Sequence, residues 1–211
     1  LLCEGKLTLK EVEEALKGFK SNKSPGNDGL TAEFYKKFWP ELKEHFMLCF
    51  DTVYTMGELT FSQKQAIIKL LEKKGKDRTH LKNWRPISLL NVDYKLASKV
   101  LANRLKEVLP NLISINQSSY VKGRYIGDTL RTIADMLDYT EIQNIPGLMM
   151  CIDFEKAFDS VDHQFTFKMM KGMKLHDDFI RWAKLAFTNT SAKCIVNGKL
   201  SKGFALPGGG R

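Results

Sequence analysis

The sequence has no apolar run long enough to cross a membrane and no pair of cysteines at metal-binding or redox spacing. A membrane-spanning helix needs about 20 apolar residues, and no signal peptide is present, so we expect no membrane association. The four cysteines are Cys3, Cys49, Cys151 and Cys194, and none forms a C-x-x-C pair. Because Cys151 and Cys194 lie in apolar runs, we expect buried free thiols and a reducing, intracellular setting, nuclear or cytoplasmic.

Acidic side chains are in the minority. Lys and Arg total 33 against 24 Asp and Glu, a net charge of +9. This excess favours a polyanionic partner such as nucleic acid, although a protein that is merely basic has the same total. The 43% apolar content excludes general disorder. The sequence starts at Leu1 without Met and stops at Arg211 after a glycine run, so we interpret it as a fragment.

Hydrophobic periodicity predicts a mixture of helices and strands without a regular βαβ alternation. The predicted helices are 8–19, a stretch from 31 to 56 interrupted at Pro40, 92–109 closed by Pro110, 128–143, 163–173 and 177–188. The predicted extended segments are 66–71, 83–90, 148–152 and a hairpin over 192–204 that turns at Asn197-Gly198. The fold class that follows is α+β.

One acid directly follows a strand-like apolar run. The run 148–152 is short enough to be a strand buried on both faces, and Asp153 comes next. Carboxylates held at such an edge suit Mg²⁺, and nucleotide polymerisation uses two of these ions. The alternative is that Asp153 only caps the following turn, and spacing alone favours that alternative.

The segment Ile152–Val161 (IDFEKAFDSV) resembles motif A of the reverse transcriptases of LINE-type (non-LTR) retrotransposons and group II introns. The resemblance implies that Asp153 and the backbone carbonyl of Phe154 bind metal. It also implies that Ala157 and Phe158 lie in the nucleotide site, where the Phe158 ring excludes a ribonucleotide 2′-OH by steric clash and desolvation. Core packing is the alternative role for Phe158.

Two upstream segments resemble the same family. Asn83–Leu90 (NWRPISLL) is similar to the fingers motif whose arginine, here Arg85, grips the triphosphate of the incoming nucleotide; a guanidinium binds phosphate bidentately. The basic loop 73–76 would supply a partner lysine, with Lys74 slightly favoured over Lys73. A solvated run of charge is the competing interpretation of these lysines.

Two further segments resemble template-contacting loops. Lys23–Gly29 is similar to the family's KSPGxDG loop, which implies template contact for Lys23, Gly26 and Gly29, although alone it is an ordinary turn. The segment Gln117–Arg124 is similar to Q-x-x-F-x-x-G-R, with Tyr120 in place of Phe. It implies a template role for Gln117 and Arg124, which otherwise are ordinary loop residues.

Together these resemblances imply a right-hand polymerase fold. Its parts would be an N-terminal extension (1–20), a fingers subdomain (21–145) and an incomplete palm (146–211). The implied activity is RNA-directed DNA polymerisation with two Mg²⁺ ions, an RNA template, a DNA primer and dNTP. The alternatives are a nucleic-acid-binding remnant of a decayed retroelement and a group II intron maturase.

The resemblance stops before the family's second acidic motif, F/Y-x-D-D. Asp177-Asp178 is not that motif, because it precedes the segment Gly203–Arg211, which resembles the start of motif B, whereas the family's acidic pair follows motif B. We predict instead that Asp177 caps a helix. Since one carboxylate cannot hold two Mg²⁺ ions, we expect this chain alone to lack polymerase activity.

Overall fold

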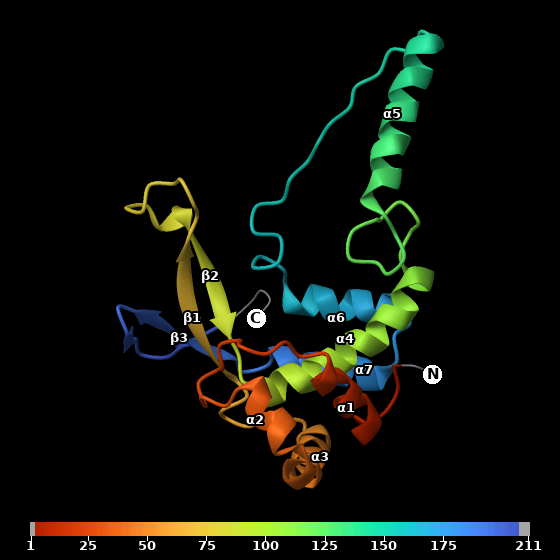
Figure 1. The fold of residues 1–211 in the computed structure, drawn as a ribbon. Helices are drawn as coiled ribbons and strands as arrows, with labels where there is room; N and C mark the ends of the chain where they lie inside the picture. The colour runs from red at the N-terminus through yellow and green to blue at the C-terminus, as the bar shows by residue number, and fades with distance from the viewer. Residues whose placement is uncertain (1–2, 207–211) are drawn as a thin grey trace. The chain divides into compact units, whose positions relative to one another are not determined.

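Helices and strands alternate irregularly along residues 3–206, the part of the chain that this computed structural model describes. The helices are α1 (Leu9–Lys17), α2 (Ala32–Lys37), α3 (Trp39–Met56), α4 (Val92–Leu112), α5 (Ile126–Ile142), α6 (His163–Gly172) and α7 (Asp177–Phe187), with a 3-10 turn η1 (Leu81–Asn83). The strands are β1 (Gln65–Glu72), β2 (Trp84–Leu89), β3 (Ser191–Val196), β4 (Lys199–Leu200) and β5 (Phe204–Ala205) (Figure 1). The mixture confirms the α+β class. Among the described residues, no helix is long and apolar enough to cross a bilayer.

Local sequence signals explain several element boundaries. Thr8 and Glu11 form a reciprocal capping box at the start of α1. Pro40 lies in the first turn of α3, where a missing N–H costs nothing. Asn197 and Gly198 have φ angles of 50° and 76° between β3 and β4, the positive pair that a type I′ turn requires. The expected hairpin at Asn197-Gly198 is therefore confirmed.

The strands form one mixed sheet. Its order is β2-β1-β3-β4, and β5 pairs with β3. The β1–β2 and β3–β4 pairs are antiparallel, whereas β1 and β3 run parallel with Ala66 opposite Ala192. The sheet thus joins strands from residues 65–89 to strands from residues 191–205.

The chain divides into two compact units. Of the described residues, one unit comprises Cys3–Leu101 with 158–206, and the other comprises Ala102–Ala157. The first ten residues of α4 belong to the first unit and the remaining eleven to the second.

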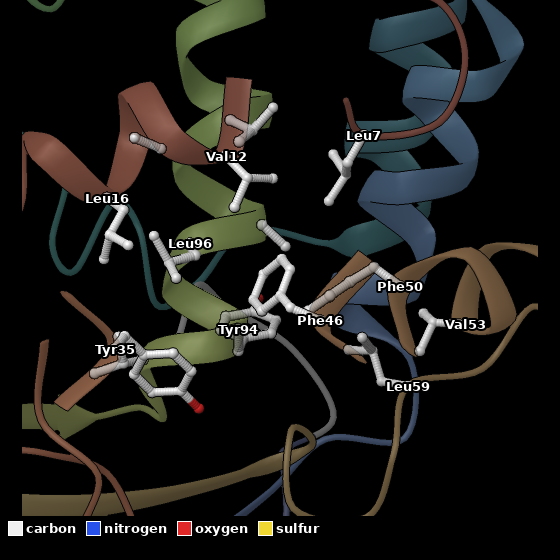
Figure 2. Close-up of a cluster of buried hydrophobic side chains, with 14 of the residues drawn as sticks. Leu7, Val12, Leu16, Tyr35, Phe46, Phe50, Val53, Leu59, Tyr94 and Leu96 are labelled. Atoms are coloured by element: carbon white, nitrogen blue, oxygen red, sulfur yellow. The ribbon is translucent and has the colours of Figure 1, made fainter. Parts of the chain in front are cut away.

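The apolar core lies in the first unit. Phe50, Leu96 and Val12 come from α3, α4 and α1 and are each at most 2% exposed. Figure 2 shows the labelled side chains of these helices converging, with Phe46 and Phe50 beside Tyr94. Trp182 of α7 joins the same cluster. Burial of this size stabilises a domain by roughly 1.5–3 kcal/mol for each large side chain.

The predicted strand at 148–152 is not formed. Leu148 and Ile152 are 89% and 73% exposed, and the segment has no regular structure. A strand needs a neighbour for its backbone groups, and none of the described strand pairs includes this segment. The prediction of a buried thiol at Cys151 is wrong for the same reason, since Cys151 is exposed. Residues 144–151 and α5 instead line an open, largely apolar hollow of about 950 Å³.

Three helix boundaries also differ from expectation. α4 continues through Pro110 to Leu112. α5 begins at Ile126, with Tyr125 as its N-cap and Asp128 in the first turn, so Asp128 is not the cap. His176, and not Asp177, caps α7, because its side chain accepts the backbone N–H of Asp178. In each case the conformation of the backbone at the helix end determines which residue is the first or last of the helix, and amino-acid composition does not specify that conformation.

Candidate functional site

Asp153 and its neighbours lie on an exposed segment without regular structure. Asp153 and Phe154 belong to the Ala102–Ala157 unit, as does Ala157, whereas Phe158 begins the second stretch of the other unit. Phe154 is 76% exposed and Phe158 is 68% exposed, so neither ring is a core residue in this structure. The segment therefore presents a carboxylate, a backbone carbonyl and two aromatic rings to solvent.

The β1–β2 hairpin presents Arg85 on an exposed face of the sheet. Arg85 pairs with Leu71, and Ile87 pairs with Lys69; paired residues share a face. Leu71 and Ile87 are 46% and 40% exposed, and Lys69 and Arg85 are also exposed. Lys193 of β3 lies on the same face, opposite Ile67. This face therefore combines cationic and apolar side chains, and its cations can pair with anionic groups such as phosphate.

Sequence reasoning missed Lys69 and Lys193. Each lysine has apolar neighbours in its strand, over 66–71 and 191–196. Because successive side chains of a strand point to opposite faces, the sequence assigns each lysine to a face of its own strand only. The parallel pairing of β1 with β3, however, brings together residues more than 120 positions apart. No local pattern specifies that pairing.

The connection from β1 to β2 is tied together by its own hydrogen bonds. The ammonium of Lys73 donates to the carbonyl of Lys82 at 2.8 Å, and Asn83 Nδ2 donates to the carbonyl of Asp77 at 2.7 Å. Lys74 is exposed, whereas Lys73 is partly buried. The two candidate lysines therefore differ in setting: Lys73 braces the loop, and Lys74 extends from it.

The loop Lys23–Gly29 packs against the start of α4. Lys23 is exposed, whereas Gly26 is buried. A Cβ added at Gly26 would lie 2.1 Å from Oδ1 of Asn91, so only glycine permits this approach. Gly29 has a φ of +74°, which also favours glycine. The loop thus presents an exposed lysine beside a backbone contact that only glycine permits.

Arg124 holds the turn that follows α4. Its guanidinium donates to the backbone carbonyls of Pro110, Ile113 and Gln117 at 3.1, 2.8 and 2.6 Å, and also to that of Ser114. These carbonyls lie at and just beyond the C-terminal end of the helix, where the last carbonyls lack partners and a cation is favourable. Gln117 also donates locally, to the carbonyl of Ser119 at 3.2 Å.

Asp177 and Asp178 lie in the first turn of α7, with an acidic side chain at the positive end of the helix. Asp178 accepts the phenol of Tyr54 and the backbone N–H of Gly5. These two hydrogen bonds, of which the one from Tyr54 has the larger effect, hold the pKa of the Asp178 carboxyl below its usual range. Both residues lie at the start of the helix that the sequence predicts over 177–188.

The described residues do not form a complete metal centre. Within residues 3–206, no three His, Cys, Asp or Glu side chains gather in a group that would hold an ion. The expected motif B start reaches 207–211, which lies outside the described residues. Arg85, Lys69 and the lysines of the 73–76 loop are brought together on one hairpin, and Asp153 belongs to the other compact unit.

Comparison with known proteins identifies the relatives of this chain. The family described as reverse transcriptase (RNA-dependent DNA polymerase) matches residues 71–206. The chain is 39% identical, over 92% of its length, to the transposon TX1 uncharacterized 149 kDa protein of Xenopus laevis, of which it covers 14%. It is 29% identical, over 74% of its length, to the putative 115 kDa protein in type-1 retrotransposable element R1DM of Drosophila melanogaster, of which it covers 15%.

A third relative carries an explicit activity in its name. The chain is 25% identical, over 74% of its length, to the RNA-directed DNA polymerase from mobile element jockey of Drosophila funebris, of which it covers 17%. The chain thus spans about one sixth or less of the length of these three relatives. The family match covers more than half of the chain, and the Xenopus relative aligns with nearly all of it. The chain therefore belongs to the reverse transcriptase family, in the group found in non-LTR retrotransposons.

Proposed function

We propose that this chain is a nucleotide-binding segment of an RNA-directed DNA polymerase that copies retrotransposon RNA into DNA. The observation that carries the proposal is the exposed basic face around Arg85, and Arg85 lies inside the region that matches the reverse transcriptase family. Its partners would be an RNA template, a DNA primer and a dNTP. In this assignment residues 21–145 belong to the fingers and 146–211 to part of the palm.

The nucleotide would be held through its phosphates and its sugar. Arg85 would bind phosphate oxygens through its planar fork, and Lys74 or Lys73 would add a second cation from the adjoining loop. Phe158, with Ala157 beside it, would face the sugar, where a bulky ring leaves no room for a 2′-OH. The support is that the side chains of Arg85 and Phe158 are both exposed to solvent.

Asp153 and the backbone carbonyl of Phe154 would contribute oxygen ligands to Mg²⁺. Two such ions, when bound, would activate the primer 3′-OH and stabilise the leaving pyrophosphate. The described residues offer too few carboxylates in one place for two ions, so further ligands would come from the rest of the parent polypeptide. We therefore propose that the 211-residue chain alone does not extend a primer.

The template would contact the loops at Lys23–Gly29 and Gln117–Arg124. Lys23 supplies an exposed cation. Gly26 lets the loop backbone approach Asn91 closely, and the positive φ of Gly29 lets the backbone turn sharply. Gln117 is exposed. Arg124 would contribute by fixing the conformation of its loop, because its guanidinium N–H groups already donate hydrogen bonds to backbone carbonyls.

The test is primer extension on an RNA template by the parent polypeptide that contains this segment. Asp153→Asn is expected to abolish extension while leaving primer–template binding intact, because it removes a metal ligand and keeps the side-chain shape. Asp177→Asn is the matched control: it changes an exposed carboxylate at a helix start and should leave extension unchanged. Full extension by the Asp153→Asn variant would exclude the proposal. Template binding by an unmutated parent that extends nothing would favour the binding remnant.

A further inference from the structure

The loop Lys23–Gly29 lies on a buried polar cluster that no catalytic role uses. Asn91, directly before α4, is 1% exposed. A Cβ at Gly26 would lie 2.1 Å from Asn91 Oδ1, 2.4 Å from Asn91 N and 2.5 Å from the carbonyl carbon of Leu90. Real side chains do not tolerate such distances, so the loop backbone is in direct contact with this residue.

The Asn91 side chain connects two segments. Its Oδ1 accepts the backbone N–H of Asp28 at 3.4 Å, and its Nδ2 donates to the carbonyl of Ser62 at 3.2 Å. Ser62 lies just before β1, and Asp28 lies in the loop. One amide thus links the loop to the segment just before β1, the first strand of the basic hairpin.

A second amide braces the same segment. Gln63, 2% exposed, accepts the backbone N–H of Thr60 at 3.2 Å and donates to Asp93 Oδ2 at 2.9 Å. Asn27 Nδ2 donates to Gln65 Oε1 at 3.0 Å, a further link between the loop and β1. Asn91 and Gln63, the two buried amides, are hydrogen-bonded in this way and fix one arrangement, because a buried polar group left unpaired is destabilising.

We propose that Asn91 is a positioning residue that holds the loop Lys23–Gly29 in place, so that Lys23 is presented to the phosphate backbone of a bound nucleic acid. The inference rests on the proposed function and deepens it by assigning a role to a residue that touches no nucleic acid. Lys23 is exposed at the start of the loop, and the buried contacts lie at its centre. Lysine suits the task because it binds phosphate as a point charge.

The test measures binding of the 211-residue chain to a fluorescent RNA template annealed to a DNA primer, over a series of salt concentrations. Lys23→Ala is expected to weaken binding several-fold and to lower the salt slope by about 1, as loss of one phosphate contact does. Asn91→Ala should cause a similar loss. The double variant should lose no more than either single variant, because Asn91 acts only through Lys23.

A local readout separates positioning from a general loss of folding. Amide hydrogen exchange at residues 26–30 should accelerate in Asn91→Ala while the amides of α3 keep their protection. Gly26→Ala approaches the same contact from the loop and should have the same effect on exchange and on affinity. Gly172→Ala is the matched control, since a Cβ at Gly172 meets nothing within 4 Å, and it should bind as the unmutated chain does.

Three results would overturn the inference. They are additive losses in the Lys23 and Asn91 double variant, unchanged exchange at residues 26–30 in both Asn91→Ala and Gly26→Ala, or unchanged affinity on Lys23→Ala. Unchanged affinity on Lys23→Ala would also remove the template contact proposed for Lys23. None of the three results bears on the polymerase activity, which is tested separately by Asp153→Asn and by primer extension in the parent. Conversely, if the parent failed to extend a primer, the coupling between Asn91 and Lys23 could still be measured from the affinities of the single and double variants for the primer–template.

Discussion

The phenol of Tyr54 on α3 donates a hydrogen bond to Oδ1 of Asp178 on α7, although the two residues are 124 positions apart. The backbone N–H of Gly5 donates to the other oxygen of the same carboxylate at 2.7 Å. One acidic side chain therefore joins the N-terminal segment, α3 and α7. This explains what the Asp177-Asp178 pair does in this structure: its second member stabilises a packing contact.

Asp178→Asn should reduce stability at neutral pH. Its folded pKa is lowered, first by the Tyr54 hydroxyl and then by the Gly5 N–H, so its contribution is present above the ordinary value of about 4 and is lost as the pH falls through the folded value. We expect a loss of roughly 1–2 kcal/mol at pH 7, moderated by partial exposure. Urea unfolding from pH 7 to pH 3 should show the two proteins converging in acid. A constant difference across that range would contradict this assignment.

Arg124→Lys should destabilise the turn after α4. Lysine has one ammonium in place of a planar fork, so it cannot reach four carbonyls at once. Loss of the charged hydrogen bonds should cost roughly 1.5–3 kcal/mol. The loss of stability should appear as faster amide hydrogen exchange at residues 113–117 and as a lower urea midpoint of unfolding. Unchanged protection together with weaker template binding would mean that Arg124 contacts nucleic acid directly.

Phe158→Ala in the parent polymerase should admit ribonucleotides. The ring is 68% exposed and comes five residues after Asp153, and removing it opens space for a 2′-OH. The measurement is the ratio of kcat/KM for dNTP and rNTP, which should fall by at least about tenfold for a difference of about 1.4 kcal/mol. An unchanged ratio would make Phe158 a packing residue in the parent.

Arg85→Ala in the parent should raise KM for dNTP at least several-fold, since charge-assisted hydrogen bonds contribute roughly 1.5–3 kcal/mol. Arg85→Lys should recover only part of the loss, because an ammonium cannot bind two oxygens in a fork. Lys82→Ala, an exposed cation on the same hairpin, is the control and should change KM little. An unaltered KM for Arg85→Ala would remove Arg85 from the phosphate site.

Much of the secondary structure was predictable because its signals are local. The capping box at Thr8, the type I′ turn at Asn197-Gly198 and the periodicity of α7 each depend on residues within a few positions. The family was predictable for a similar reason, since ordered motifs such as Ile152–Val161 are contiguous. The roles given to Arg85, Phe158 and Asp153 remain predictions until the parent is assayed.

The segment 148–152 was mispredicted because burial is not a local property. Its apolar residues indicate a strand, but a strand forms only where another chain segment offers backbone partners, and no described strand pairs with it. The exposed Cys151 follows from the same cause. Similarly, His176 and not Asp177 is the N-cap of α7, because the direction in which the chain enters the helix decides which side chain reaches the first free backbone N–H groups.

The sequence by itself determined the α+β class, nearly all helices and strands, and membership of the reverse transcriptase family, because these follow from short-range patterns. Only the tertiary structure decided that β1 pairs with β3, that Lys69 and Lys193 share a face with Arg85, and that Asn91 lies under the loop at Gly26. These contacts join residues far apart in the chain. They depend on how helices and strands pack and pair, and no short-range pattern encodes that.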